Sequence, residues 1–265
     1  MDLQLQDKII IVTGAAKGIG RAIVKILARE GAIPVIVGRN EKDNQQLKCE
    51  IENTGGRCFS ITAELANPDN SAMVINKVMD EFDTIDGLVN NAGQNDGVGL
   101  ENGNYADFML SLHKNVVHYY LLAHFALPFL KASRGVILNI GSKTAETGQG
   151  GTSAYAASNG ARNALTREWA VELLPFSIRV NSIIVAECWT PLYESWLNSK
   201  SNSDQRLAEI KMRIPLENRM TTVDEIAHTA AFLLSNLSSH TTGQLIHVDG
   251  GYVHLDRALN KTQDQ

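Results

Sequence analysis

The residues whose types and spacing could do chemistry begin with a glycine-rich segment near the N-terminus. Residues 13–20 read TGAAKGIG and follow the β-branched apolar run at 8–13. Gly14 allows a tight turn, and Gly18 and Gly20 let a phosphate group and the next helix approach the backbone closely. Free N–H groups at the start of that helix favour an anion. A plain strand-to-helix turn needs fewer glycines, so the spacing predicts a loop that binds the diphosphate of a dinucleotide.

The elements that would position this loop alternate along the whole chain. Apolar runs predict strands at 8–13, 33–37, 57–62, 86–89, 135–140, 178–185 and 244–248, with helices at 21–30, 41–53, 68–82, 104–130, 153–174 and 223–234. Strands that are buried on both faces read as such runs. Their alternation with helices predicts βαβ units, and therefore an α/β fold whose parallel sheet is covered by helices on both faces.

Composition and charge exclude several classes of function. The 265 residues include 29 acidic and 24 basic side chains, a formal net charge of −5, and no Lys/Arg cluster, so we expect no nucleic-acid partner. No apolar run approaches the ~20 residues that span a bilayer, and no secretory leader is recognisable, so we expect a cytoplasmic protein with no membrane partner. The cysteines are scattered and the histidines lack metal-ligand spacing, so neither a disulfide framework nor a metal is expected.

Several motifs at the ends of the expected strands resemble the short-chain dehydrogenase/reductase family. The resemblance spans nearly the whole chain and rests on Thr13–Gly20, Asn90–Gly93, Asn115, Ser142, Tyr155 and Val248–Gly251. It implies a single Rossmann-type domain over residues 1–265, a doubly wound parallel sheet of seven strands in a three-layer α/β/α arrangement, with a substrate-lid insertion at about 187–213. It also implies an NAD(P)-dependent oxidoreductase that acts on a small molecule.

The resemblance assigns catalytic roles residue by residue. Tyr155 matches the acid/base of the family, Ser142 the hydroxyl that holds the substrate oxygen, and Asn115 the helical asparagine of a water-linked proton path. In the family, a lysine four residues after the tyrosine lowers the pKa of that tyrosine and binds the nicotinamide ribose. This chain has Asn159 there, which can donate a hydrogen bond to the ribose but supplies no charge.

The exchange of lysine for Asn159 leaves two hypotheses. A free tyrosine has a pKa near 10, so it needs help to ionise at neutral pH. In the first hypothesis the nicotinamide, water or another cation helps Tyr155, and the enzyme favours high pH. In the second, the chain binds the nucleotide but turns over slowly or not at all. The retention of Tyr155, Ser142 and Asn115 favours an active enzyme.

Charge near the expected adenosine end favours NADP(H). NAD-binding members of the family usually have an aspartate where this chain has Gly38; Arg39 follows it, and Lys17 lies in the glycine-rich segment. Two cations without a carboxylate suit a 2′-phosphate. The alternative is that both cations are surface residues and that NAD(H) is accepted as well. The expected cofactor-binding residues are Gly14, Lys17, Gly18, Ile19, Gly20, Arg39, Glu64, Asn91, Ala92, Gly93, Tyr155, Asn159 and Thr190.

The loops expected at the carboxyl ends of the strands are polar. Their candidate substrate residues are Gln94, Glu146, Gln149, Glu187, Trp189 and Tyr193. Hydroxyl-pairing groups beside an aromatic face suit a sugar, although each residue alone could be a solvated loop residue. Residues 187–193 and 251–258 resemble sugar dehydrogenases that act on L-fucose, and His254 and Arg257 are candidates to close the pocket. The alternatives are a carbonyl or 3-oxoacyl-type reductase of the same family, or a weakly active NADP-binding protein.

The resemblance also predicts assembly as a homotetramer or homodimer. In the family, the helices expected at 104–130 and 153–174 pair between subunits. Apolar side chains on these helices could serve either that interface or the core of one chain, and they are Leu121, Leu122, Phe125, Leu165, Trp169 and Leu173.

Overall fold

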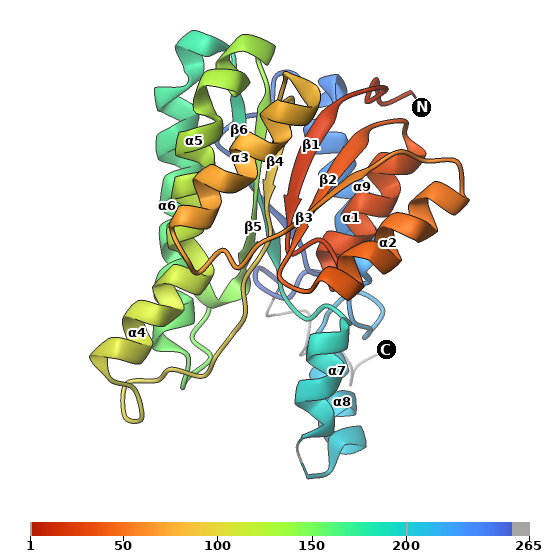
Figure 1. Ribbon diagram of the computed structural model, residues 1–265. Helices are drawn as coiled ribbons and strands as arrows, with labels where there is room; N and C mark the ends of the chain where they lie inside the picture. Colours follow the sequence, from red (N-terminus) through yellow and green to blue (C-terminus); the bar gives the residue numbers. More distant parts are fainter. Residues whose placement is uncertain (1, 200, 256–265) are drawn as a thin grey trace.

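A parallel sheet of seven strands, in the order β3-β2-β1-β4-β5-β6-β7, forms the centre of the protein (Figure 1). The computed structural model describes residues 2–199 and 201–255. The strands are β1 Ile9–Thr13, β2 Ile33–Gly38, β3 Phe59–Thr62, β4 Gly87–Asn90, β5 Val136–Ser142, β6 Arg179–Val185 and β7 Leu245–Val248. The order reverses between β1 and β4, where a doubly wound sheet opens a crevice at the carboxyl ends of its strands. The predicted fold class is confirmed.

Helices cover both faces of the sheet, which gives three layers (Figure 1). One face carries α1 Gly18–Arg29, α2 Glu41–Asn53 and α9 Val223–Leu234, and the other carries α3 Asp69–Phe82, α5 His118–Ser133 and α6 Ser153–Glu172. Side chains of β1 alternate between two cores, with Ile10 and Val12 in one and Ile9 and Ile11 in the other. This alternation explains why a strand buried on both faces reads as an unbroken apolar run. Within the described ranges, no helix is long and apolar enough to cross a membrane.

The helix expected over residues 104–130 is interrupted, which corrects the sequence prediction. It divides into α4 Tyr105–Leu112, a π-helical turn at His113–Val117, and α5. Asn115 lies in the π-helical turn and is fully buried. Its Nδ2 donates to the Ser111 carbonyl at 2.9 Å, and its Oδ1 accepts from the backbone N–H of Gln94 at 2.9 Å. The wider turn shifts the phase of the helix, and such turns are frequent at functional sites.

The segment between β6 and α9 folds into two further helices, α7 Pro191–Asn198 and α8 Ser203–Met212. They project from the body of the protein beyond the end of β6 (Figure 1). Thr190 caps α7, because its Oγ1 accepts from the backbone N–H of Tyr193 at 3.1 Å, and Pro191 occupies the first helical position. Both helices lie within residues 187–213, the range in which the sequence predicts an insertion.

Most apolar side chains that could have served a subunit interface belong to the core of one chain. Leu122, Trp169 and Leu173 are buried in the cluster beneath α3, α5 and α6, and Phe125 and Leu165 pack against that cluster. Leu121 is half-buried. Three exposed apolar residues lie at the C-terminal end of α6 and just after it, and none of them was an interface candidate. They are Val171, Leu174 and Phe176.

His118 at the start of α5 should make stability depend on pH. Burial, and then the charge of Arg162, lower its pKa from 6.5 to about 3. Between these pH values the unfolded chain binds a proton that the folded chain does not. We therefore expect the free energy of unfolding to fall, by up to about 1.4 kcal/mol per pH unit, as the pH drops below 6.5. His118 contributes no pH dependence above that window.

Urea unfolding of His118→Asn at pH 7, 6 and 5 measures this contribution. The slope of stability against pH should be shallower in His118→Asn than in the parent chain, whereas the exposed His228→Asn should keep the parent slope. Equal slopes for the parent and His118→Asn would contradict the prediction.

Candidate functional site

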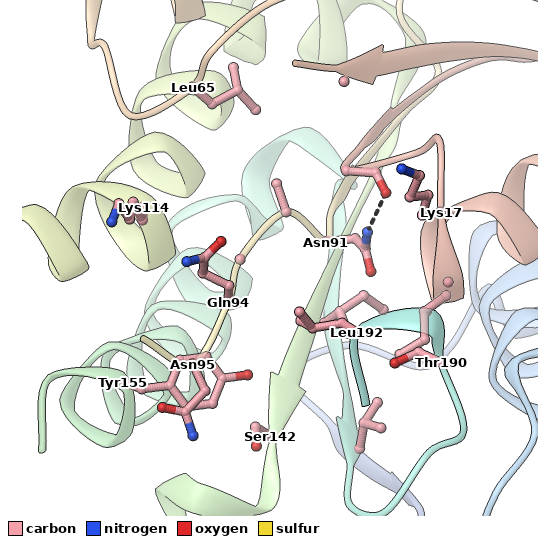
Figure 2. Close-up of a pocket in the computed structure, with 18 of the residues that line it drawn as sticks. Lys17, Leu65, Asn91, Gln94, Asn95, Lys114, Ser142, Tyr155, Thr190 and Leu192 are labelled. Carbon is pink, nitrogen blue, oxygen red and sulfur yellow. Dashed lines mark hydrogen bonds between the residues drawn. The ribbon is translucent and has the colours of Figure 1, made fainter. Parts of the chain in front are cut away.

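A cavity of about 660 Å³ lies at the carboxyl ends of the strands. Segments that follow β1, β2, β3, β4, β5 and β6 all contribute to its wall. Figure 2 shows Lys17 and Thr190 at one end and Tyr155 and Ser142 toward the other. The sequence-predicted residues that line it are Gly14, Lys17, Gly18, Ile19, Arg39, Glu64, Asn91, Ala92, Gly93, Gln94, Ser142, Tyr155, Thr190 and Tyr193.

The glycine-rich loop fits a diphosphate. Gly14 and Gly18 adopt φ of +61° and +55°, which disfavour a side chain, and a Cβ at Gly14 would lie 3.0 Å from Ala92 Cα. Gly20 lies behind the loop, where a Cβ would collide with the carbonyl oxygen of Gly14. Helix α1 begins at Gly18 with no side-chain cap and no acidic residue in its first turn. Its N–H groups and dipole are therefore available to an anion.

The segment after β4 is attached to the end of β1. Thr13 Oγ1 accepts from the backbone N–H groups of Asn91 and Ala92 at 2.8 and 2.9 Å, and Asn91 Nδ2 donates to the Thr13 carbonyl at 2.7 Å. The same amide reaches the Gly14 carbonyl at 3.3 Å (Figure 2). Asn91 therefore shapes the loop through its side chain. Thr13 was not among the predicted site residues, although its hydroxyl at a buried strand end was a signal.

The adenosine end corrects one premise of the cofactor prediction. Each cation there has a carboxylate partner, because Lys17 Nζ lies 2.7 Å from Asp43 Oδ2 and Arg39 Nη1 lies 3.8 Å from Glu64 Oε2. Position 38 has no room for the aspartate that NAD-binding members usually carry. The buried Asn44 donates from Nδ2 to the Gly38 carbonyl at 3.0 Å, and a Cβ at Gly38 would collide with Asn44 Oδ1.

Tyr155 and Ser142 face the same cavity. Ser142 ends β5 and Tyr155 lies in the first turn of α6, so a strand end and a helix start bring the two hydroxyls into one wall. Ser142 Oγ accepts from the hydroxyl of Thr144 at 3.1 Å, which orients it. Asn115 is one layer behind, where it holds the backbone of the cavity residue Gln94.

Asn159 does not reach the cavity, where the resemblance would have it bind the nicotinamide ribose. It is fully buried and does not line the cavity within the described chain. Its Nδ2 donates to the Tyr155 carbonyl at 2.9 Å, and its Oδ1 accepts from Arg162 Nη1 at 3.0 Å. Arg162 lines the cavity instead. Sequence reasoning missed Arg162, although a charged residue one turn after Asn159 on an otherwise buried helix face was a signal.

At the substrate end, ion pairing joins the catalytic loop to the insertion. Lys143, next to Ser142, forms a largely buried ion pair with Glu187, whose Oε2 accepts from the Tyr193 hydroxyl at 2.6 Å. Burial, and then the charge of Glu187, raise the pKa of Tyr193 above its usual range, so its hydroxyl stays protonated. Trp189 packs near Tyr193, with ring centroids 6.3 Å apart. Lys143 was not among the predicted residues.

A cluster of two histidines and a carboxylate was also missed. Glu146 Oε2 lies 2.9 Å from His247 Nε2, and these atoms and a ring nitrogen of His254 all lie within 4.8 Å of one another. Sequence spacing could not reveal it, because Glu146 and His247 are 101 residues apart. Of the predicted substrate residues, Gln94 and Tyr193 line the cavity as described, whereas Glu146, Gln149, Glu187 and Trp189 do not. Arg257 lies outside the described residues.

The steric argument for Gly20 gives a test of the diphosphate loop. Gly20→Ala should push α1 away from the loop and raise the dissociation constant of the dinucleotide about 5- to 150-fold, since overpacking of this kind costs about 1–3 kcal/mol. Calorimetric titration measures it. Gly148→Ala is the control, because a Cβ there meets nothing within 4 Å. Equal affinity in Gly20→Ala and the parent chain would refute this account of the loop.

Comparisons with known proteins agree with this geometry. The family model described as enoyl-(acyl carrier protein) reductase matches residues 14–253. Cyclopentanol dehydrogenase of Comamonas testosteroni is 31% identical, over 94% of this chain and 98% of its own. The 3-oxoacyl-[acyl-carrier-protein] reductase of Thermotoga maritima is 33% identical, over 95% and 100%. L-fucose dehydrogenase of Mus musculus is 31% identical, over 96% and 92%.

Solved structures show the same arrangement. The crystal structure of Cj0485 dehydrogenase has a TM-score of 0.92 and 45% identity, over 97% of this chain and 98% of that one. A putative gluconate 5-dehydrogenase from Beutenbergia cavernae, solved with bound NADP, has a TM-score of 0.88 and 31% identity, over 95% and 99%. The chain belongs to the short-chain dehydrogenase/reductase family and is an NAD(P)-dependent oxidoreductase.

Proposed function

We propose that the protein is a sugar dehydrogenase that prefers NADP(H) and oxidises a small aldose, of the L-fucose type, to its lactone. The observation that carries the proposal is the polar end of the cavity beside Ser142 and Tyr155. Gln94, Asn95 and Tyr193 line it, and the Lys143–Glu187 pair holds Tyr193 in place. Side chains that donate and accept hydrogen bonds beside an aromatic surface match the hydroxyl groups of a sugar. The matches to an L-fucose dehydrogenase and to a putative gluconate 5-dehydrogenase support the same substrate class.

The residues of this chain would handle the proton and orient the substrate. Bound NADP(H) would supply the hydride acceptor or donor. In the oxidative direction Tyr155 takes the proton of the reacting hydroxyl, and Ser142 holds its oxygen. The Thr144 hydroxyl, 3.1 Å from Ser142 Oγ, fixes the direction of that contact. Asn115 acts from behind by positioning Gln94.

The preference for NADP(H) rests on Lys17 and Arg39. The Arg39 side chain is 69% exposed, and its contact with Glu64 is long at 3.8 Å. Exposed ion pairs of this kind contribute about 0–1 kcal/mol, so a 2′-phosphate can displace the carboxylate and form stronger charge-assisted hydrogen bonds. The Asn44 side chain also occupies the space that an acidic residue at Gly38 would need.

An oxoacyl or carbonyl reductase is the second candidate. The matches to an acyl-carrier-protein reductase model and to a 3-oxoacyl reductase favour it, and so do Pro191 and Leu192 in the cavity wall. A substrate panel separates the two candidates. Oxidation of aldoses with no reduction of oxoacyl thioesters supports the proposal, and the reverse supports the second candidate.

The acid/base assignment predicts the effect of removing one hydroxyl. Tyr155→Phe should lower kcat on the best aldose by about 10²–10⁴-fold, because a positioned general base contributes on that scale. Reduced nucleotide is followed by absorbance. Tyr105→Phe is the matched control, since this tyrosine is 81% exposed, and it should leave kcat unchanged. Comparable rates for Tyr155→Phe and the parent would remove Tyr155 from the mechanism.

The cofactor preference is tested by Arg39→Gln. Loss of a charge-assisted contact to the 2′-phosphate should raise KM for NADP⁺ about tenfold and leave KM for NAD⁺ nearly unchanged. Lys42→Gln, an exposed cation outside the cavity wall, is the control. A parent chain with equal kcat/KM for the two nucleotides would overturn the preference.

A further inference from the structure

We infer that Arg162 supplies the positive charge that this family otherwise places four residues after the tyrosine, and that it does so by stabilising the Tyr155 phenolate. The inference rests on the acid/base role proposed for Tyr155. It makes Arg162 a positioning residue whose charge acts through Tyr155, and it makes Asn159 the side chain that holds the guanidinium in place.

Arg162 is a buried cation with neutral partners. It is 3% exposed. Nε donates to the Asn115 carbonyl at 2.7 Å, and Nη1 donates to the Ile140 carbonyl and to Asn159 Oδ1, both at 3.0 Å. These acceptors fix the orientation of the guanidinium but leave its charge uncompensated. Burial of an unpaired charge is costly, so a purely structural role at this position would be better served by a neutral side chain.

Other cations around the cavity are already paired. In the part of the chain that the structure describes, the cationic side chains of the wall are Lys17, Arg39, Lys114 and Arg162. The first three lie within 4.0 Å of Asp43, Glu64 and Asp96, respectively. Among the same described residues, no ion pair includes Arg162. The Lys143 ammonium near Ser142 is likewise paired, with Glu187.

Two tyrosines face this guanidinium, and of the two only Tyr155 lines the cavity. The Arg162 Cζ lies 4.3 Å from the ring centroid of Tyr119 and 6.0 Å from that of Tyr155. Tyr119 is fully buried and donates its hydroxyl to the Ile140 carbonyl at 3.2 Å, and burial raises its pKa to about 12. Tyr155 opens into the cavity. His118, also in the wall, is held neutral because burial and Arg162 lower its pKa to about 3.

The surroundings accommodate the guanidinium and would not accommodate a lysine beside it. A Cβ at Gly93 would lie 2.7 Å from Arg162 Nη2, so the glycine leaves room for the larger head group. Asn159 is within hydrogen-bond distance of Arg162, so a lysine at 159 would bring two like charges together in a buried site. Asn159 and Arg162 therefore act together. The positive charge lies one helical turn further along α6 than the lysine of the family.

The charge predicts a specific change in the pH profile. A guanidinium keeps its charge at every pH at which a protein is folded. In the parent chain, activity that depends on the Tyr155 phenolate should therefore rise at lower pH than in a chain with a neutral residue 162. The Arg162 Cζ lies 6.0 Å from the centre of the Tyr155 ring, which is close enough for its charge to act on the phenolate.

The test compares Arg162→Met, Arg162→Lys and the double variant Asn159→Lys/Arg162→Leu. Arg162→Met should move the rising limb of kcat/KM to higher pH, with at least a tenfold loss at neutral pH that is recovered at alkaline pH. Arg162→Lys should retain most of the neutral-pH rate. The double variant, which restores the family arrangement, should return the limb toward the parent position. A folded Arg162→Met variant that loses activity equally at all pH values overturns the inference.

A substrate-independent measurement separates this inference from the proposed function. Ultraviolet difference titration, parent minus Tyr155→Phe, reports ionisation of Tyr155 in the free protein. The same pair is compared in the Arg162→Met background. Phenolate that appears at lower pH when Arg162 is present supports the inference even if no aldose is turned over, and coincident titrations overturn it. If Arg162→Met does not fold, the double variant Asn159→Lys/Arg162→Leu decides. A rising limb of kcat/KM that lies at higher pH in this variant than in the parent, although residue 159 is then charged, would contradict the inference.

Discussion

The parallel pairing of β1 with β2 on one side and β4 on the other sets the geometry on which the site depends. Parallel strands end at the same edge, so the glycine-rich loop, the segment after β4 and the end of β5 meet there. Thr13 fixes their relative position, because its hydroxyl accepts from the backbone of the segment after β4. The candidate residues for binding and for proton transfer thus come from distant parts of the chain and are held together by the hydrogen bonds of one sheet.

Electrostatics divides the cavity into two functional ends. At the adenosine end the Lys17 and Arg39 side chains are exposed, and exposed ion pairs contribute little, so an anionic group of a ligand can replace their carboxylates. At the catalytic end Arg162 is buried, and its partners are neutral. The first arrangement suits binding that exchanges with solvent, and the second suits a charge that must stay fixed while a proton moves.

Local patterns allowed much of the fold to be predicted, and departures arise where contacts are long-range. The apolar runs and the glycine-rich loop at residues 13–20 could be located from sequence, because each depends mainly on residues that are close together along the chain. The π-helical turn around Asn115 has no glycine or proline to announce it. The carboxylates beside Lys17 and Arg39 come from other elements. The sequence shows that Asn159 replaces the lysine of the family, but the proposed role of Arg162 could be found only from the packing of α6 against Asn115 and Ile140.

The Lys143–Glu187 pair has a kinetic consequence. Lys143 adjoins Ser142, and Glu187 precedes α7 and holds Tyr193, so one ion pair links α7 to the hydroxyl that we propose orients the substrate. A largely buried charge that loses its partner is strongly destabilising, because it is left uncompensated. Displacement of α7 therefore disturbs the reacting end, and substrate entry and product departure become coupled to the alignment of Ser142. In the proposed mechanism, a product held longer by α7 would therefore also be held against a better aligned Ser142.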